Sequence, residues 1–306
     1  MTTSPHRLIE QIIDSANQIL LGKDRVIKLS LTTLLAGGHL LLEDLPGVGK
    51  TTLSHLLGKL LGLDFQRIQF TSDLLPADII GVSIFEQSAS RFVFHPGPLF
   101  SQLVLADEIN RATPKTQSAL LEAMEEQQIS VDGQTHTLPT PFFVVATQNP
   151  QTHIGTFPLP ESQLDRFMMR LEIGYPDSHA ERELLEGLDR RKMIHDLHHI
   201  IEPETLAELQ AKIDQVYTSP ALLDYCQSVI AYSRNTSLFQ NGLSPRAALS
   251  LLQAARGWAF IHGREEVLPD DLQAVIPGVV DHRLSLHEQL PAQSASQQIL
   301  DNVAVN

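Results

Sequence analysis

The segment 43–52 carries glycine, lysine and threonine at a spacing that suits a polyphosphate ligand. Gly47 and Gly49 allow the backbone to approach phosphate oxygens closely, and Lys50 can reach the terminal phosphates. The hydroxyl of Thr51 can bind Mg²⁺, and a helix that begins there would direct the positive end of its dipole at the anion. We therefore predict a ligand-binding loop made of Pro46, Gly47, Val48, Gly49, Lys50, Thr51 and Thr52.

One position departs from the usual G-x-x-x-x-G-K-[ST] pattern, because Asp44 stands where glycine is expected. A plain turn between a strand and a helix would also fit this segment by itself. However, Gly-Lys-Thr falls between the apolar run 40–42 and the helix-like run 53–61. That order of strand, loop and helix favours phosphate binding over the plain turn.

Two adjacent carboxylates follow a second apolar run, 103–106. The carboxyl end of a buried strand is where open α/β sheets bind their ligands. There Asp107 could hold Mg²⁺, directly or through water, and Glu108 could orient and deprotonate an attacking water. The pair alone would also suit a strand that enters a solvated turn. Together with the glycine loop, it indicates nucleotide hydrolysis.

Further polar residues follow a third apolar run, 142–146. Asn149 could position water or contact a terminal phosphate, and a turn-forming Asn before Pro150 is the alternative. Two arginines stand later in the chain, Arg166 before a fifth strand-like run and Arg246 at the start of a helix. Arginine can stabilise transferring phosphoryl oxygens, although a structural ion pair for Arg166 and a solvated helix start for Arg246 remain open.

Short apolar runs alternate with helical patterns in the first part of the chain. Such an order predicts parallel strands covered by helices on both faces of the sheet. Two hairpins are expected as well, across residues 82–94 and 129–138, and Asp132-Gly133 is a strong turn signal in the second. The five predicted strands are 39–42, 65–70, 103–106, 142–146 and 168–173.

The character of the chain changes after Pro176, because only helical patterns follow. We place a domain boundary here, which gives an α/β domain over 1–176 and an all-helical domain over 177–306. A length of 306 residues suits two domains. The polar end from Gln293 is expected to fray. Helix breaks are predicted near Pro203, Pro220, Asn241-Gly242, Pro269 and Pro277.

Charge and composition argue against several kinds of partner without excluding a local basic groove. A net charge of −14, from 22 basic and 36 acidic residues, argues against broad attraction to nucleic acid or to an anionic membrane. The run 29–42 is too short to span a bilayer, and the first residues lack the apolar core of a signal peptide. The single Cys226 cannot form an intrachain disulfide. We predict a soluble, cytoplasmic protein.

Taken together, these motifs resemble the MoxR family of AAA+ ATPases, in the helix-2-insert clade that also holds magnesium-chelatase subunits and MCM-type helicases. The resemblance covers nearly the whole chain, from about Ile12 to Leu290. The stretches most specific to the family are DEINRA at 107–112 and LPESQLDRF at 159–167. Asp44 is a familiar variation in this family, so it does not argue against nucleotide binding.

Carried over by position, the resemblance implies roles for the residues near the loop. Lys50 and Thr51 become the Walker A pair, Asp107 and Glu108 become Walker B, and Asn149 becomes sensor 1. The implied cofactors are ATP and Mg²⁺, with Thr51 and Asp107 as the residues that hold the metal.

Residues farther from the loop receive implied roles as well. Arg166 resembles the finger that reaches the ATP of a neighbouring subunit, and Arg246 resembles sensor 2 on the lid. Arg111 is a further candidate for a contact with a neighbour. Gly22 and Lys23 would lie near the adenine.

The implied fold is an AAA+ P-loop NTPase core with a parallel five-stranded sheet, two β-hairpin inserts and a C-terminal all-α lid. The implied activity is ATP hydrolysis by a homo-oligomer, a hexameric ring, that remodels or matures a protein partner. That partner would carry a von Willebrand factor A domain or be a metal-dependent client. Two alternatives stay open: a nucleic-acid translocase related to MCM proteins, which the acidic balance disfavours, and a nucleotide-gated scaffold with little turnover, which Glu108 disfavours.

Overall fold

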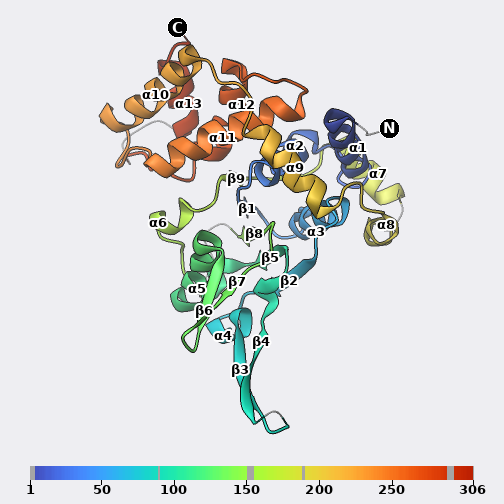
Figure 1. The fold of residues 1–306 in the computed structure, drawn as a ribbon. Helices are drawn as coiled ribbons and strands as arrows, with labels where there is room; N and C mark the ends of the chain where they lie inside the picture. The colour runs from blue at the N-terminus through green and yellow to red at the C-terminus, as the bar shows by residue number, and fades with distance from the viewer. Residues whose placement is uncertain (1–3, 89, 150–154, 188–189, 288–292, 306) are drawn as a thin grey trace.

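The computed structural model describes residues 4–88, 90–149, 155–187, 190–287 and 293–305; Pro150, expected in a turn, lies outside them. The fold is built around a sheet in the order β2-β5-β8-β1-β9, in which every neighbouring pair is parallel (Figure 1). The predicted α/β class and the parallel five-stranded sheet are confirmed. The strands are β1 (Leu40–Glu43), β2 (Phe65–Gln69), β5 (Leu103–Asp107), β8 (Phe143–Gln148) and β9 (Met169–Leu171).

The central strands are buried on both faces, which explains why they read as continuous apolar runs. Successive side chains of a strand point to opposite faces. In β5, Leu103 and Leu105 therefore join one hydrophobic cluster, while Val104 and Ala106 join a second. The first cluster also contains side chains from α1 (Pro5–Asn17), α2 (Asp24–Leu35) and α3 (Lys50–Leu60). The second contains side chains from α4 (Pro76–Ile80), η1 (Pro98–Phe100), η2 (Ile109–Arg111) and α5 (Pro114–Glu126).

Two antiparallel hairpins extend from this core, as predicted. The longer one projects away from the body, at the end opposite the C-terminal helices (Figure 1). His136 of the shorter hairpin stacks on Phe94 of the longer one, with ring centroids 4.0 Å apart, so the two hairpins contact each other. The longer hairpin is β3 (Gly81–Glu86) with β4 (Arg91–Pro96), and the shorter is β6 (Gln128–Val131) with β7 (Gln134–Thr137).

The remainder of the described chain is mainly helical. Four of its helices begin with proline, which suits the first helical position because the N–H that proline lacks has no partner there. Among the described residues, no helix combines the length and the apolar character that crossing a membrane requires. The helices are α6 (Glu161–Leu164), α7 (Ser178–Glu186), α8 (Arg190–Asp196), α9 (Pro203–Ile213), α10 (Pro220–Asn235), α11 (Pro245–Ile261), α12 (Pro269–Val280) and α13 (Ala295–Asn302).

Two predictions about the helical part are wrong. Pro277 does not break a helix but lies inside α12, whose side chains Val275, Ile276 and Val279 are fully buried. Burial of that apolar face outweighs the hydrogen bond that an interior proline removes. The C-terminal residues, expected to fray, instead form α13, and Ile299 anchors this helix in the core.

One hydrophobic core joins the α/β part to the helical part. Gly257 of α11 lies so close to α2 that a Cβ at this position would be 3.1 Å from Cγ2 of Thr32. Leu34 of α2 and Leu251 of α11 belong to the same buried cluster. The division of the chain into domains at residue 176 therefore stays a prediction.

His39, just before β1, is a buried neutral histidine. Its Nδ1 accepts the backbone N–H of Val144 at 3.0 Å, and its Nε2 lies 3.3 Å from the carbonyl oxygen of Met124. Since Nδ1 accepts, Nε2 carries the proton and donates it to that carbonyl. Burial lowers the pKa of His39 from 6.5 to about 4.

The free energy of unfolding is expected to fall as the pH drops from 6.5 toward 4, because the unfolded chain then binds a proton that folded His39 does not. The shift corresponds to roughly 3 kcal/mol once the pH lies below both pKa values. Urea unfolding near neutral pH and near pH 4.5 measures the loss. His39→Gln should lose less between these conditions than wild type, and the exposed control His198→Gln should behave as wild type. Equal losses in wild type and His39→Gln would contradict this assignment.

Candidate active site

The carboxyl ends of β1, β5 and β8 meet at one edge of the sheet. The register pairs Glu43 at the end of β1 with Gln148 at the end of β8, so the segments that follow these strands begin side by side. They enclose a cleft of about 310 Å³. Its lining consists of residues that the sequence singles out: Pro46, Gly47, Gly49, Lys50, Thr51, Thr52, Asp107, Glu108 and Asn149.

The loop after β1 has a backbone shape that suits a bound anion. Gly47 and Gly49 have φ angles of 87° and 105°, in the left-handed region that residues with a Cβ rarely adopt. A Cβ added at Gly47 would meet no atom within 4 Å, so the space over the loop is open. Helix α3 begins at Lys50, and the first N–H groups of a helix have no partners within it. The loop and the helix end thus offer N–H donors to an anion.

Lys50 is a buried cation in this cleft, with 8% of its surface exposed. Its ammonium donates to the carbonyl oxygens of Asp44 and Leu45 and to Oδ1 of Asn149, the last two at 3.0 and 3.1 Å. Burial lowers the pKa of Lys50, and nearby carboxylates oppose the shift. Anionic phosphate oxygens would hold this charge better than the neutral oxygens that hold it here. The cleft therefore fits a nucleotide.

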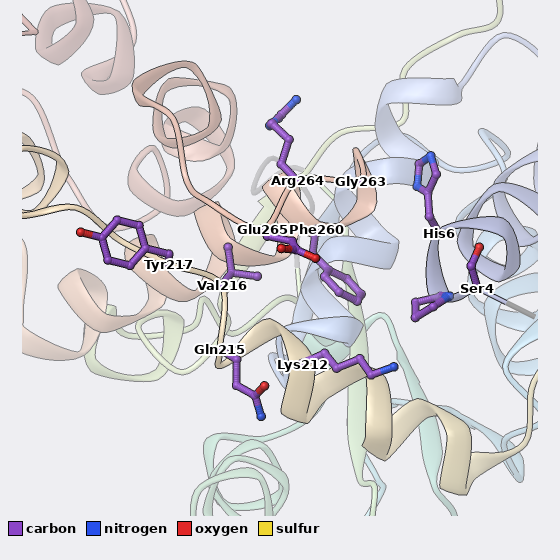
Figure 2. A pocket seen from close by; sticks show the side chains of 11 residues that line it. Ser4, His6, Lys212, Gln215, Val216, Tyr217, Phe260, Gly263, Arg264 and Glu265 are labelled. Carbon is purple, nitrogen blue, oxygen red and sulfur yellow. The ribbon is translucent and has the colours of Figure 1, made fainter. Parts of the chain in front are cut away.

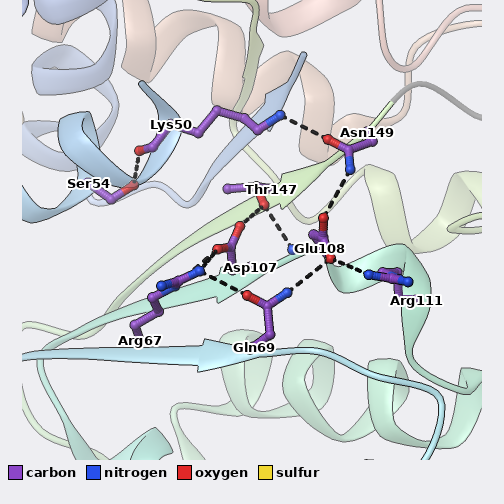
Figure 3. A network of polar contacts seen from close by, with 9 residues as sticks. All are labelled: Lys50, Ser54, Arg67, Gln69, Asp107, Glu108, Arg111, Thr147 and Asn149. Carbon is purple, nitrogen blue, oxygen red and sulfur yellow. Dashed lines mark hydrogen bonds and ion pairs between the residues drawn. The ribbon is translucent and has the colours of Figure 1, made fainter. Parts of the chain in front are cut away.

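Glu108 lies at the centre of a polar network (Figure 3). Its φ of 57° and ψ of 48° are unusual for a residue with a Cβ. Its Oε1 accepts from Nδ2 of Asn149 at 3.1 Å, and its Oε2 accepts from Gln69 at 3.0 Å and from Arg111 at 2.9 Å. The carboxylate is thus held by several donors, and Asn149 links it to Lys50. Arg111, a candidate for a contact with a neighbour, pairs here with its own chain.

Asp107 is buried, and both of its carboxylate oxygens are engaged (Figure 3). Oδ1 accepts from the hydroxyl of Thr147 at 2.6 Å, and Oδ2 accepts from Arg67 at 2.7 and 3.0 Å. The Thr147 hydroxyl also accepts the N–H of Glu108 at 2.9 Å, so one hydroxyl joins the two acidic residues. Arg67 donates further to Gln69 at 2.9 Å, which closes the network.

Sequence reasoning missed Arg67, Gln69 and Thr147. Arg67 and Gln69 flank the buried Ile68 in β2, a pattern that puts both polar side chains on one face of the strand. Nothing in the sequence alone puts β2 beside β5, so their partners could not be predicted. Thr147 gives a weak signal, as a polar residue near the end of an apolar run.

Asp44, the departure from the usual loop pattern, has a structural role. Its Oδ2 accepts the backbone N–H groups of Ile173 and Gly174 at 2.8 and 2.6 Å. Its Oδ1 accepts the N–H of Leu45 at 2.7 Å. Glycine could make none of these bonds. Asp44 therefore ties the start of the loop to the chain that follows β9.

We expect Asp44→Gly to destabilise the protein, although it introduces the more usual residue. The change removes a charged acceptor from two backbone donors and adds freedom to the unfolded chain, which together cost about 2 to 4 kcal/mol. Urea unfolding measures this loss. Asp44→Asn keeps one acceptor oxygen and should lose less than Asp44→Gly. An unchanged unfolding midpoint in Asp44→Gly would contradict the role that we assign to this carboxylate.

Three residues expected to bind the nucleotide do not belong to the cleft lining. Val48 packs against the hydrophobic core. Gly22, with a φ of 68°, faces α7, where a Cβ at 22 would be 3.2 Å from Cβ of Ala180. Lys23 donates to the carbonyl oxygen of Tyr175 at 2.7 Å. The contact of Gly22 and Lys23 with an adenine stays a prediction.

Arg166 and Arg246 lie together at the opposite edge of the sheet. Leu40, the first residue of β1, pairs with Met169, so Arg166 precedes β9 at the amino ends of the strands. Nε of Arg166 is 3.3 Å from Oε2 of Glu125, and Arg246 donates to Oε1 of the same carboxylate. Neither Arg166 nor Arg246 is among the described residues that line the cleft.

A second cavity, of about 700 Å³, lies between α1, α9 and α11 (Figure 2). Two of its polar side chains already have partners, since His6 pairs with Glu10 at 3.2 Å and Arg264 pairs with Asp271. Within the described part of the chain, its lining shares no residue with the cleft at the sheet edge. The cleft, in which charged groups converge, remains the candidate active site.

Known protein families match both parts of the chain. The family described as ATPases associated with various cellular activities (AAA) matches residues 39–169. The AAA lid domain matches residues 231–303, which confirms the predicted C-terminal helical lid. The core and the lid thus have the architecture of an AAA+ ATPase.

Individual relatives cover nearly all of the chain. It is 44% identical to YeaC of Bacillus subtilis, over 98% of this chain and 95% of that protein. It is 40% identical to Chaperone MoxR1 of Mycobacterium tuberculosis, over 96% of this chain and 80% of that protein. The crystal structure of a candidate ATPase from Cytophaga hutchinsonii matches with a TM-score of 0.90 and 36% identity, over 98% of this chain and 96% of that one. The chain therefore belongs to the MoxR family of AAA+ ATPases and is an ATP hydrolase.

Proposed function

We propose that this ATPase binds MgATP in the cleft at the carboxyl edge of the sheet and uses its hydrolysis for chaperone-like remodelling of a partner protein. The observation that carries the proposal is the chain of hydrogen bonds from Lys50 through Asn149 to Glu108. It joins a cation suited to terminal phosphates to a carboxylate suited to activating water. The loop residues Pro46, Gly47, Val48, Gly49, Lys50, Thr51 and Thr52 would hold the phosphates.

In this proposal Glu108 is the general base, and Asn149 aligns the water and the terminal phosphate. The hydrogen bonds that Glu108 accepts from Asn149, Gln69 and Arg111 support this role, because they fix the carboxylate before the reaction. Proton transfer to a base that is already oriented requires little reorganisation of the surrounding groups.

Thr51 and Asp107 would hold Mg²⁺, which would offset charge on the phosphate oxygens. Both oxygens of Asp107 already accept hydrogen bonds from Thr147 and Arg67. We therefore propose that Asp107 holds the ion through water. Mg²⁺ keeps several waters in most protein sites, which agrees with an indirect contact of this kind.

We further propose that a neighbouring copy of the chain completes the site with Arg166 and Arg246. Strand β1 has four residues and spans about 13 Å, so the two edges of the sheet are well separated. Both arginines lie at the edge away from their own cleft, on Glu125. A ring in which this edge faces the cleft of the next subunit would bring both to a neighbour's ATP, and we propose a hexamer.

The partner that we propose is a cytoplasmic protein with a von Willebrand factor A domain, or a client that such a protein helps to load with metal. Support comes from the relative named Chaperone MoxR1 and from the family resemblance. A purified candidate partner should bind the ATP-bound ring more tightly than the nucleotide-free ring. Equal binding in both states would contradict ATP-driven remodelling of that partner.

Assembly and turnover should change together if a neighbour completes the site. ATP turnover per subunit, measured over a dilution series beside mass by light scattering, is expected to rise as rings form. Constant turnover per subunit from monomer to ring would contradict the proposal. Strong stimulation by DNA that declines steeply with salt would favour a nucleic-acid translocase instead.

A further inference from the structure

A single buried arginine of the lid holds the backbone on both sides of Arg166. This residue, Arg283, lies just beyond α12, and its side chain is 4% exposed. Its Nε donates to Oδ1 of Asp165 at 2.7 Å, and its Nη2 donates to the carbonyl oxygens of Asp165 and Phe167 at 3.0 and 2.7 Å. Its Nη1 donates to the carbonyl oxygen of Met168 at 3.1 Å. Every residue of the segment 165–168 except Arg166 itself is thus bound to Arg283.

The remaining donor of Arg283 is also used, by the carbonyl oxygen of Val279 in α12. All five N–H groups of the guanidinium therefore have acceptors. Burial lowers the pKa of Arg283, and the charge of Asp165 opposes that shift. A buried charge is tolerated only when it is paired and fully hydrogen-bonded, and the planar fork of arginine meets this demand where lysine, with three donors, could not.

Other residues of the lid bind the same segment. Nε2 of His282 lies 3.1 Å from the carbonyl oxygen of Phe167. The hydroxyl of Ser244 donates to Oδ2 of Asp165 at 2.8 Å, and Ser244 is the N-cap of α11, two residues before Arg246. The lid therefore contains Arg246 and binds the backbone on both sides of Arg166, so its contacts hold both arginines in place.

We propose that Arg283 is a positioning residue for hydrolysis in the neighbouring subunit. It fixes the backbone that carries Arg166, so the position of the lid determines the direction in which the Arg166 side chain points. This inference rests on the proposed function, in which Arg166 acts on a neighbour's ATP. It separates two properties: ATP binding in the chain's own cleft is independent of Arg283, whereas turnover in the next cleft depends on it.

Arg283→Lys keeps the charge but cannot make all five hydrogen bonds. We expect kcat of the ring to fall about 10- to 100-fold, because small errors in position cost this much in phosphoryl transfer. KM and the Kd for ATP should stay within about twofold of wild type, because the substitution does not change the cleft of the subunit that carries it. The matched lid variant Arg256→Lys should keep wild-type turnover. A wild-type kcat in Arg283→Lys, or a loss confined to ATP affinity, would overturn the inference.

Mixed rings separate positioning from general damage. Arg283→Lys subunits retain an intact cleft, and Glu108→Gln subunits retain an intact Arg166 and its support. Mixing the two should restore turnover, because the correctly positioned Arg166 of a Glu108→Gln subunit can then complete the intact cleft of an Arg283→Lys subunit. Turnover that stays as low as in the separate variants would overturn the inference, provided that Arg166→Ala mixed with Glu108→Gln recovers.

The mixture of Arg166→Ala with Glu108→Gln distinguishes a failure of completion by a neighbour from a failure of the role of Arg283. If it does not recover, the proposed completion by a neighbour fails, and the role of Arg283 fails with it. If Arg283→Lys does not fold, as judged by circular dichroism, Ser244→Ala removes a second donor to Asp165 more mildly. It should lower kcat about two- to fivefold, with recovery in the same mixture. Unchanged kcat in Ser244→Ala, or a loss without recovery, would overturn the inference.

Discussion

Glu108→Gln is expected to lower kcat for ATP hydrolysis by about 10²- to 10⁴-fold, the range that general-base catalysis contributes. The amide has the shape of the carboxylate but cannot accept a proton from water. Among the described residues, the Glu108 carboxylate accepts hydrogen bonds from Asn149, Gln69 and Arg111 and none from Lys50 or the glycine loop, so ATP affinity should remain near wild type. Phosphate release measures kcat, and titration with a fluorescent ATP analogue measures affinity.

The hydrogen bonds around Glu108 determine how much Glu108→Gln lowers the free energy of unfolding. Asn149, Gln69 and Arg111 all donate to the carboxylate. In Glu108→Gln, an amide NH₂ must face at least one of these donors, which costs about 1 to 2 kcal/mol. The exposed variant Glu122→Gln is the matched control and should change neither quantity. Turnover above about a tenth of wild type would remove Glu108 from the role of general base.

The same comparison decides whether the protein is a scaffold with little turnover. Wild type and Glu108→Gln would then hydrolyse ATP at the same slow rate, because no catalytic base would be at work in either. A wild-type rate far above that of the variant supports an active hydrolase, as membership of the AAA+ ATPases indicates.

Arg166→Ala is expected to have the second large effect, a loss of about 10³-fold or more in kcat of the assembled protein. In the proposed ring, the neighbour's Arg166 would offset charge on the transferring phosphoryl group, and the described lining of the cleft holds no arginine that could replace it. ATP affinity should change little, because Arg166 lies on Glu125 at the edge away from its own cleft. Steady-state kinetics at a concentration where rings form measures both.

The stability of Arg166→Ala should differ little from wild type. Its ion pair with Glu125 is partly exposed, and such pairs contribute at most about 1 kcal/mol. Arg182→Ala removes a comparable ion pair, with Glu186, at a remote and more exposed site and should leave kcat unchanged. Hydrolysis abolished in a monomeric Arg166→Ala but retained in its assembled form would show that this arginine does not serve a neighbour.

The parts of the fold that the sequence predicts are those set by local patterns. The strands are visible because burial on both faces demands runs such as that of β5, and their predicted ends differ from the structure by at most two residues. Asp132-Gly133 predicts the turn of the shorter hairpin, and both residues have the positive φ angles, 51° and 77°, that such a turn needs. The residues of the cleft are predictable because each lies at the carboxyl end of a strand or in the loop and helix start that follow it.

The parts that the sequence does not predict depend on contacts between distant segments. Pro277 stays inside α12 because tertiary burial outweighs local propensity. Arg67 reaches Asp107 only because β2 lies beside β5, an order that no local pattern encodes. The meeting of Arg166 with Arg246 on Glu125 joins segments that are far apart in the chain.

In the proposed ring, each ATP site is completed by a neighbouring copy of the chain. The most direct test mixes Glu108→Gln with Arg166→Ala, two variants that should each be nearly inactive alone. In randomly mixed rings, about a quarter of the interfaces join an intact Glu108 to an intact Arg166. We predict that turnover of the equimolar mixture recovers to about that fraction of wild type. A mixture as inactive as its separate components, although mass measurements show mixed rings, would contradict completion of the ATP site by a neighbour.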